Sequence, residues 1–253
     1  MTLRVYIGYD PRDDLAFEVC AASILKHSSI PVDIRPLKDW ELRQARVYMR
    51  SYRVDETGQS WDDRDGKPFS TQFSFTRFAV PILENYADEW VVFVDADFMF
   101  KADIAELLAL ADPDKAVMCV QHNHYPPETV KMYGCLQTQY FRKNWSSLML
   151  IRPSGCRGMT RYELNNSTGQ RLHSLVWVRD EQIGALPKEW NWLEGWDDPK
   201  AEKKAVHYTR GTPDMLSDDL PHAEEWWSYL KDDRPPIILG DATEMASSAG
   251  ALQ

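Results

Sequence analysis

Two carboxylates, Asp95 and Asp97, stand two positions apart directly behind an apolar run at residues 90–94. Such a run, bounded by charge, is typical of a strand that is buried on both faces. Ligands of open α/β sheets bind outside the carboxyl ends of strands, so the pair is expected at a binding edge. Two carboxylates in so tight a turn suit Mg²⁺ or Mn²⁺ shared with phosphate oxygens. The alternative is an ordinary solvated turn, in which aspartate is common.

The same pair locally resembles the motif of haloacid-dehalogenase-type phosphatases, which carry a nucleophilic Asp and a second Asp two positions later. That motif normally continues to Thr or Val and lies near the start of the chain. Here Met99 stands at that place, and three strand or helix units come first. The sequence therefore disfavours a phosphatase.

The first half of the chain alternates short apolar runs with helical patterns, and these elements would position the pair. Strands are expected at 4–7, 32–34, 90–94 and 116–120, and helices at 15–26, 74–86 and 104–110. This order predicts an α/β fold with a mixed, mainly parallel central sheet flanked by helices. In the second half the strand candidates are only residues 147–151 and 205–208. Tryptophans concentrate there and could stack on sugar rings, although core packing is the better interpretation for each.

Length and charge limit the classes of protein that fit. The chain has 253 residues, 43% of them hydrophobic, with 29 basic and 39 acidic residues and a net charge of −10. We expect a single domain over residues 1–240, with a nucleotide-binding half at about 1–120, an acceptor half at about 121–240 and a flexible tail at 241–253. The acid excess argues against a nucleic-acid partner. It is compatible with a diphosphate ligand only if a cation lies between, which predicts strict metal dependence.

Cysteine usage and the apolar segments predict the compartment. The four cysteines include no C-x-x-C pair, so neither a zinc site nor a disulfide framework is expected. With no signal-peptide pattern and no apolar run of transmembrane length, we expect a cytoplasmic location. Trp226 and Trp227, with Lys231 and Arg234, could attach the chain peripherally to the inner membrane face. Acidic neighbours favour an ordinary amphipathic helix instead.

Five segments carry a resemblance to a known family and lie in the family's order, and the helix ending at residues 23–27 resembles the one that follows the family's first strand. The five segments are residues 6–10, 75–81, 93–97, 145–151 and 206–213. They resemble, in turn, the nucleotide-binding end of a first strand, a Y-x-R-L-x-x-P helix, an L-D-A-D motif, an N-S-G-V-x-L-I strand and an H-x-x-G-x-x-K-P-W element. Together they are similar to a GT-A fold glycosyltransferase, most of all to family 8, the group of glycogenin and bacterial lipopolysaccharide galactosyltransferases. The resemblance implies a GT-A, Rossmann-like nucleotide-diphospho-sugar transferase fold.

The resemblance also implies a set of site residues. His207 would be the third metal ligand beside Asp95 and Asp97, holding Mn²⁺ or Mg²⁺. Tyr9 would stack near the base and Asp10 would reach the uracil or ribose. The implied nucleotide-sugar-binding residues are Gly8, Tyr9, Asp10, Arg77, Asp95, Ala96, Asp97, Ser146, Arg210 and Gly211.

The family's D-Q-D stretch is loosely matched by Asp180 and Gln182, in a register ambiguous by one residue. The resemblance implies that these two residues stabilise an oxocarbenium-like centre, with retention at the anomeric carbon. A leaving phosphate oxygen would take the acceptor's proton. The alternative is an acidic helix start whose carboxylates the helix dipole favours.

Two departures from the family pattern leave other functions open. The lysine of the last element is absent, so Arg210, or Lys203 and Lys204, would have to supply positive charge to the diphosphate. The usual N-S-G is replaced by Trp145, Ser146 and Ser147, which bears on the donor-sugar contacts. These departures motivate a non-catalytic nucleotide-sugar or glycan-binding protein as the alternative. A sugar-phosphate nucleotidyltransferase ranks last because residues 8–12 contain one glycine and no glycine-rich phosphate loop.

The expected function is therefore metal-dependent transfer of a hexose from a nucleotide sugar, a UDP-sugar by family analogy, to a carbohydrate or other hydroxyl acceptor. By the same analogy the setting is polysaccharide biosynthesis at the cell envelope. Acceptor contacts are expected around residues 131–143 and in the tryptophan-rich stretch, since loops of this kind vary freely.

Overall fold

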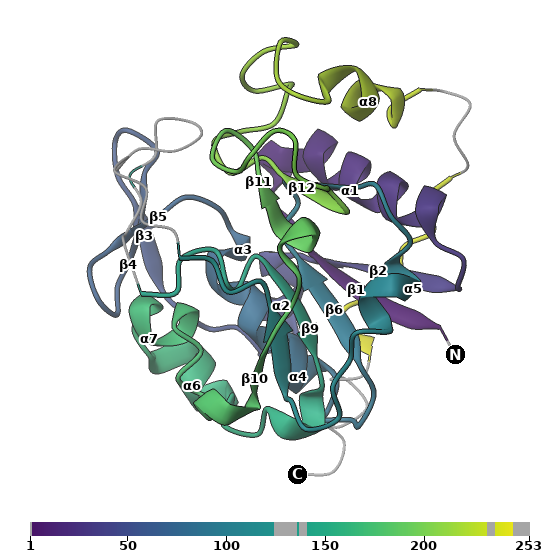
Figure 1. The fold of residues 1–253 in the computed structure, drawn as a ribbon. Helices are drawn as coiled ribbons and strands as arrows, with labels where there is room; N and C mark the ends of the chain where they lie inside the picture. Colours follow the sequence, from purple (N-terminus) through teal and green to yellow (C-terminus); the bar gives the residue numbers. More distant parts are fainter. Residues whose placement is uncertain (1, 124–135, 137–140, 232–235, 245–253) are drawn as a thin grey trace.

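The computed structural model describes residues 2–123, 136, 141–231 and 236–244, and a six-stranded sheet forms its centre (Figure 1). The sheet has the order β10-β8-β9-β6-β1-β2. Its strands are β1 (Leu3–Gly8), β2 (Val32–Leu37), β6 (Val91–Val94), β8 (Val117–Cys119), β9 (Leu148–Ile151) and β10 (Ile183–Ala185). The pairs β1–β2, β1–β6 and β8–β10 are parallel, whereas β9 runs antiparallel to both of its neighbours. The prediction of a mixed, mainly parallel sheet is confirmed.

The direction of β9 determines which residues meet at the binding edge. Because β6 and β8 run the same way, their carboxyl ends share an edge, and β9 starts at that edge. Val94 pairs with Leu148, and Cys119 pairs with Met149. As a result the backbone N–H of Asp95, just after β6, donates to the carbonyl of Ser147, just before β9, at 2.8 Å.

A small sheet brings a distant histidine to the same edge. Its order is β11-β12-β7, and its strands are β7 (Phe98–Phe100), β11 (Trp192–Leu193) and β12 (Ala205–His207). Strands β12 and β7 pair antiparallel with His207 opposite Phe98, so His207 lies beside Asp97. Neither β7 nor β11 is predicted from the sequence, because runs this short have no measurable periodicity.

A second small sheet and the helices surround this core. The sheet has the order β3-β4-β5 and lies to one side of the molecule (Figure 1), with β3 (Tyr52–Val54), β4 (Ser60–Asp62) and β5 (Pro68–Phe69). The helices are α1 (Asp14–His27), α2 (Asp39–Gln44), α3 (Phe73–Thr76), α4 (Val80–Leu83), α5 (Ile104–Leu108), α6 (Arg161–Asn166), α7 (Gly169–His173) and α8 (Ala223–Ser228). Helix α1 packs against β7.

The helix predicted over residues 74–86 is interrupted in the structure. It is divided into α3, a 3₁₀ turn at Arg77–Ala79, and α4. Pro81 lies in the first turn of α4, where its missing N–H costs no hydrogen bond. Asn85 and Tyr86 have φ values of 48° and 55°, which end the helix.

Strand β6 is buried on both faces, as its continuous apolar run predicts. Val91 and Phe93 pack in one hydrophobic cluster, whereas Val92 and Val94 pack in the cluster on the other side. All four side chains are fully buried. The strand is therefore a rigid base for the carboxylates that follow it.

The end of the described chain docks on the sheet edge. The N–H of Gly240 donates to the carbonyl of Ile34 at 2.8 Å, and Arg35 Nη1 donates to the carbonyl of Asp241 at 3.1 Å. Ala242 is buried. Residues 241–244 of the expected flexible tail are thus held against β2, and residues 245–253 lie outside the described part.

The tryptophan pair of α8 is divided between core and surface. Trp226 is 1% exposed and packs with Val19 and Tyr208, whereas Trp227 is 36% exposed. Arg234, the second basic residue of the membrane prediction, lies outside the described residues, as do most of residues 131–143. Across the described residues, none of the helices has both the length and the apolar character that crossing a bilayer requires.

Candidate functional site

Asp95, Asp97 and His207 form a compact, buried cluster. One ligand atom from each side chain lies within 4.8 Å of those of the other two. His207 Nε2 lies 3.4 Å from Asp97 Oδ1, and the three residues are between 2% and 8% exposed. Two carboxylates and an imidazole nitrogen form a donor set that suits Mn²⁺, and carboxylates also suit Mg²⁺. The residues present therefore fit the divalent cation that the sequence predicts.

Arg77 lies next to this cluster and contacts one of its carboxylates directly. Its Nη1 lies 2.9 Å from Asp95 Oδ1 and donates to the carbonyl of Ser146 at 3.0 Å. Its Nε donates to the carbonyl of Phe73 at 3.2 Å. One guanidinium against two carboxylates leaves an excess negative charge that a divalent cation would neutralise.

The negative potential of the cluster affects the helix beneath it. Cys20 of α1 contacts the carbonyl of Asp95 through its sulfur, at 3.8 Å. Burial raises the pKa of the Cys20 thiol well above its usual value, and the nearby charges of Asp97 and Asp95 raise it further. Cys20 is accordingly a protonated packing residue and not a nucleophile.

Residues at the carboxyl end of β1 are arranged differently from the prediction. A Cβ atom on Gly8 would lie 2.6 Å from the Phe73 ring, so Gly8 allows close packing of α3 against β1. The Tyr9 ring packs edge-to-face on the rings of Phe17 and Trp40. Trp40, in α2, is 41% exposed. This exposed ring is not predicted from the sequence, because α2 is too short to be recognised.

Asp10 is committed to the loop that contains it. Its Oδ1 accepts from the N–H and Nε of Arg12, and its Oδ2 accepts from Arg12 Nη2 and from the N–H of Gln72. Burial would raise the pKa of Asp10, but these hydrogen bonds outweigh it and lower the pKa. The residue is 1% exposed. The predicted contact between Asp10 and a uracil or ribose therefore has no support in the structure, because its acceptor positions are used internally.

The other predicted sugar and phosphate contacts are spread around the cluster. Ser146 is buried, and its hydroxyl shares a 3.0 Å hydrogen bond with His173 Nδ1. Arg210 Nη2 donates to both carboxylate oxygens of the buried Glu194, each at 3.0 Å. Ala96 is buried in the turn between β6 and β7. Gly211 follows a turn in which its N–H donates to the carbonyl of Tyr208, and its φ of 136° favours glycine.

Asp180 and Gln182 are not brought to the cluster. They occupy a 3₁₀ turn that precedes β10, and the carbonyl of Gln182 accepts from the N–H of Ala116, just before β8. This places the turn at the amino edge of the parallel strands, opposite Asp95. The Asp180 carboxylate pairs with Arg142 at 2.9 Å, and Gln182 Oε1 accepts from Arg179. Their catalytic assignment stays a prediction.

The chain is similar in sequence to a plant protein over most of its length. It is 46% identical over 237 residues to Protein CDI of Arabidopsis thaliana, covering 90% of this chain and 86% of that protein. The chain belongs to the Protein CDI family. No established family model matches it.

Solved glycosyltransferases share the fold of this Protein CDI family member. The bifunctional glycosyltransferase WbbM matches 92% of the chain with a TM-score of 0.55 and 15% identity, and GlyE of Streptococcus pneumoniae TIGR4 matches 99% with a TM-score of 0.55 and 16% identity. The chain spans only 50% of WbbM and 63% of GlyE. A Q189E active-site mutant of LgtC matches 90% of the chain over 95% of its own length, with a TM-score of 0.53 and 10% identity. The Protein CDI family member therefore has the GT-A glycosyltransferase fold.

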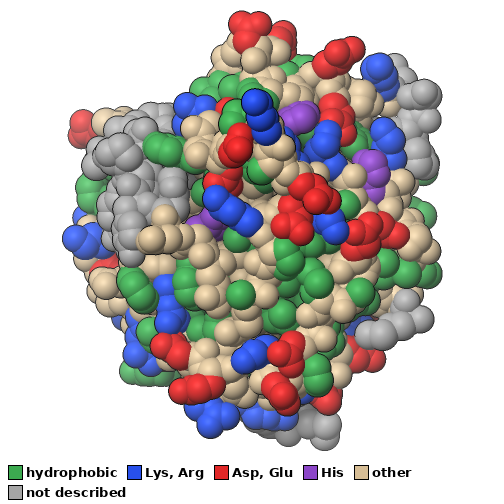
Figure 2. Space-filling view, viewed as in Figure 1, with side chains coloured by type: hydrophobic (Ala, Val, Ile, Leu, Met, Phe, Trp, Pro, Cys, Tyr) green, Lys and Arg blue, Asp and Glu red, His purple; other side chains and the backbone are tan. Residues whose placement is uncertain are grey.

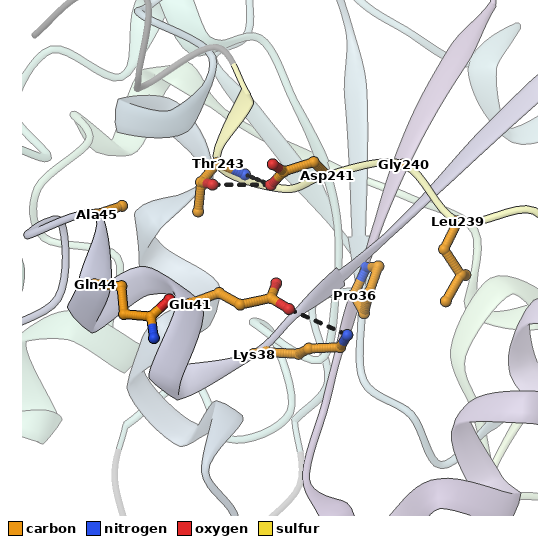
Figure 3. A pocket seen from close by; sticks show the side chains of 9 residues that line it. All are labelled: Pro36, Lys38, Glu41, Gln44, Ala45, Leu239, Gly240, Asp241 and Thr243. Atoms are coloured by element: carbon orange, nitrogen blue, oxygen red, sulfur yellow. Dashed lines mark hydrogen bonds and ion pairs between the residues drawn. The ribbon is translucent and has the colours of Figure 1, made fainter.

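A separate pocket of about 610 Å³ lies at the edge of β2 in this Protein CDI family member (Figure 3). It lies between β2, α2 and the segment at residues 239–243. Its lining residues are Pro36, Lys38, Glu41, Gln44, Ala45, Leu239, Gly240, Asp241 and Thr243. Within the pocket lining, Lys38 Nζ forms an ion pair with Glu41 at 3.2 Å. The pocket contains none of the three cluster residues.

Figure 2 shows one face of the Protein CDI family member, on which acidic and basic side chains are interspersed. A nucleic-acid-binding face would instead carry a continuous basic patch. That nucleic acid is not a partner, which the net charge predicts, stays a prediction.

The close packing at Gly8 gives a stability prediction. Replacing Gly8 by alanine is expected to lower the free energy of unfolding by about 1–3 kcal/mol, because the new methyl group would overlap the Phe73 ring. Urea unfolding followed by circular dichroism measures the change. An unchanged midpoint would contradict this packing.

Proposed function

We propose that the chain is a metal-dependent glycosyltransferase that moves a hexose from a nucleotide sugar, a UDP-sugar, to a hydroxyl of a carbohydrate acceptor. The observation that carries the proposal is the buried cluster of Asp95, Asp97 and His207 at the carboxyl edge of a GT-A fold. In open α/β folds this edge is where ligands bind. The proposed partners, a nucleotide-sugar donor and a carbohydrate acceptor, are the kinds that glycosyltransferases of this fold use.

In this proposal, each residue at the cluster has a separate role in binding the cation that contacts the donor. Asp95 and Asp97 hold a Mn²⁺ or Mg²⁺ ion together with His207 Nε2, and Arg77 fixes the Asp95 carboxylate in place. When bound, the cation supplies Lewis-acid stabilisation of the charge that develops on the leaving nucleoside diphosphate. The surrounding burial strengthens these charges' interactions relative to bulk water.

The exposed ring of Trp40 is the platform we propose for the nucleobase. It lies in α2, just after the carboxyl end of β2, and packs against Tyr9 with 5.7 Å between ring centroids. Lys38 Nζ lies 5.6 Å from the centroid of the Trp40 ring. A half-exposed aromatic face next to a cation suits a base attached to a phosphorylated ribose.

Replacing Trp40 by alanine is expected to weaken UDP binding about tenfold, because base stacking on an aromatic ring contributes about 1–3 kcal/mol. Isothermal titration with UDP in the presence of Mn²⁺ measures the effect. Trp227→Ala is the matched control, since Trp227 is also partly exposed, at 36%, but lies in α8. This variant should bind UDP as the wild type does. Equal affinities of the Trp40→Ala variant and the wild type would remove this platform from the proposal.

A donor screen tests the function itself. The full chain is incubated with a panel of nucleotide sugars, with Mn²⁺, with Mg²⁺ or with a chelator, and donor hydrolysis and thermal unfolding are measured. We expect turnover and a raised melting temperature with a UDP-sugar and a divalent cation, and neither in the chelator. Product mass spectrometry with candidate acceptors then gives the transferred sugar. Absence of both effects across the panel would refute the proposal.

The second candidate is a nucleotide-sugar or glycan-binding protein without turnover. Two observations favour it: Arg210 is paired with the buried Glu194, and Gln182 lies at the opposite edge of the sheet. UDP binding with no hydrolysis or transfer from any donor would support this candidate over the transferase.

A further inference from the structure

Asn191 lies directly behind the cluster and contacts the histidine. It is fully buried, at the end of the 3₁₀ turn Lys188–Asn191 that leads into β11. Its Oδ1 lies 2.8 Å from His207 Nδ1. Asn191 is not predicted from the sequence, because its position bears no spacing relation to the aspartates or to the histidine.

The orientation of the Asn191 amide follows from its other neighbours. The Ser147 hydroxyl donates its only proton to the carbonyl of Asn144, at 2.7 Å. Ser147 Oγ can therefore only accept from Asn191 Nδ2, at 3.0 Å. The same Nδ2 also donates to the carbonyl of Asn144, at 3.3 Å. The NH₂ group thus faces these two acceptors, and the amide oxygen faces the imidazole.

This orientation selects one tautomer of His207. The amide oxygen of Asn191 carries no proton, so Nδ1 of His207 must be the donor in their hydrogen bond. In the neutral imidazole, Nε2 then holds the lone pair, and Nε2 is the atom 3.4 Å from Asp97 Oδ1. The Phe98 ring stacks on the imidazole at 4.3 Å, which restricts rotation of the ring.

We propose that Asn191 is a positioning residue that keeps His207 in the tautomer and orientation in which Nε2 can bind the cation. Ser147 extends this role, because its hydroxyl fixes the Asn191 amide while its carbonyl accepts from the N–H of Asp95. Ser147 therefore contacts both Asn191, which holds His207, and the backbone of Asp95. Partners of this kind set the basicity and direction of a metal-binding imidazole, and their loss typically costs about 10–100-fold in metal affinity. The inference rests on the metal site of the proposed function.

The test measures Mn²⁺ binding to the full chain by electron paramagnetic resonance, together with the hyperfine coupling of the ion to a directly bound imidazole nitrogen. Asn191→Leu keeps the size of the side chain and removes its hydrogen bonds. We expect its Mn²⁺ affinity to fall by about 10–100-fold and the nitrogen coupling to disappear, as in His207→Ala. A purely structural role for Asn191 would leave the nitrogen coupling of bound Mn²⁺ intact.

A conservative variant and a matched control separate positioning from packing. Asn191→Asp keeps an oxygen opposite His207 Nδ1, and the Ser147 hydroxyl can rotate to donate to the new carboxylate. We expect this variant to retain the nitrogen coupling. Gln59→Met removes another buried amide, which donates to the carbonyls of Ser60 and Phe69 in the β3-β4-β5 sheet. It is expected to leave Mn²⁺ affinity within twofold of wild type.

The outcomes distinguish this inference from the function it rests on. Failure of the wild-type chain to bind Mn²⁺ would overturn the metal site itself. Normal Mn²⁺ binding by the wild type, with affinity and nitrogen coupling unchanged in Asn191→Leu, would overturn only the role of Asn191. If Asn191→Leu does not fold, Ser147→Ala replaces it, and an affinity and coupling equal to wild type would overturn the inference in the same way.

Discussion

Replacing Asp97 by asparagine is expected to lower the turnover of a nucleotide-sugar donor by about 10³-fold, which corresponds to about 4 kcal/mol in the barrier. The substitution keeps the shape of the side chain and removes one of two negative charges beside His207 Nε2. Steady-state donor hydrolysis in saturating Mn²⁺ measures the loss. The same variant should no longer show a Mn²⁺-induced rise in melting temperature.

Stability without metal separates this effect from misfolding. Because Asp95 and Asp97 lie close together in a buried site, removing one charge relieves their repulsion, so the metal-free variant should be at least as stable as the wild type. Asp103→Asn is the control: Asp103 caps α5 by accepting from the N–H of Ala105, and asparagine caps helices equally well. An Asp97→Asn variant with full metal-dependent activity would eliminate the assigned metal site.

Replacing Arg77 by methionine is expected to lower the free energy of unfolding by about 3–5 kcal/mol, because it leaves the Asp95 carboxylate buried without its guanidinium partner. The two side chains are 7% and 10% exposed, so water compensates little. Urea unfolding of the metal-free protein measures the loss. Saturating Mn²⁺ should restore part of it, since the cation would compensate the same carboxylate.

An exposed ion pair provides the comparison for Arg77. Arg171 pairs with Glu163 at 2.6 Å, but its side chain is 52% exposed. Arg171→Met should therefore cost less than about 1 kcal/mol. A loss of similar size in both variants, or a loss at Arg77 below 1 kcal/mol, would show that the Arg77–Asp95 pair does not stabilise the fold.

The part of the site that follows a long buried strand could be predicted from the sequence. Residues 90–94 form a continuous apolar run that is typical of a doubly covered strand, and Asp95 and Asp97 come directly after it. The order of the segments that resemble glycosyltransferases then selected His207. The structure brings these three residues together within 4.8 Å.

The part built from non-local contacts could not be predicted. Asn191 contacts His207 where β11 pairs with β12, and β11, with two residues, is too short to show a period. Asp180 and Gln182 match a motif only loosely, and the pairing of β10 with β8 places the backbone of Gln182 at the amino edge of the sheet. Asp10 has the expected residue type, but Arg12 and Gln72 occupy its oxygens. A sequence motif therefore predicts residue types, whereas the pairing of the strands determines which side chains are in contact.

The pairing of β12 with β7, in which His207 lies opposite Phe98, has a consequence for the lifetime of the protein. It connects segments that are far apart along the chain, and closing so long a loop costs entropy, so we expect it to form late in folding. A partly folded chain then has no complete cluster, and a cation that binds the cluster binds only the finished fold. By mass action, such a cation at a hundredfold excess over its dissociation constant adds about 2.7 kcal/mol to stability. If the chain binds a cation as proposed, depletion of that cation would therefore increase its cleavage by proteases as well as lower its transferase activity.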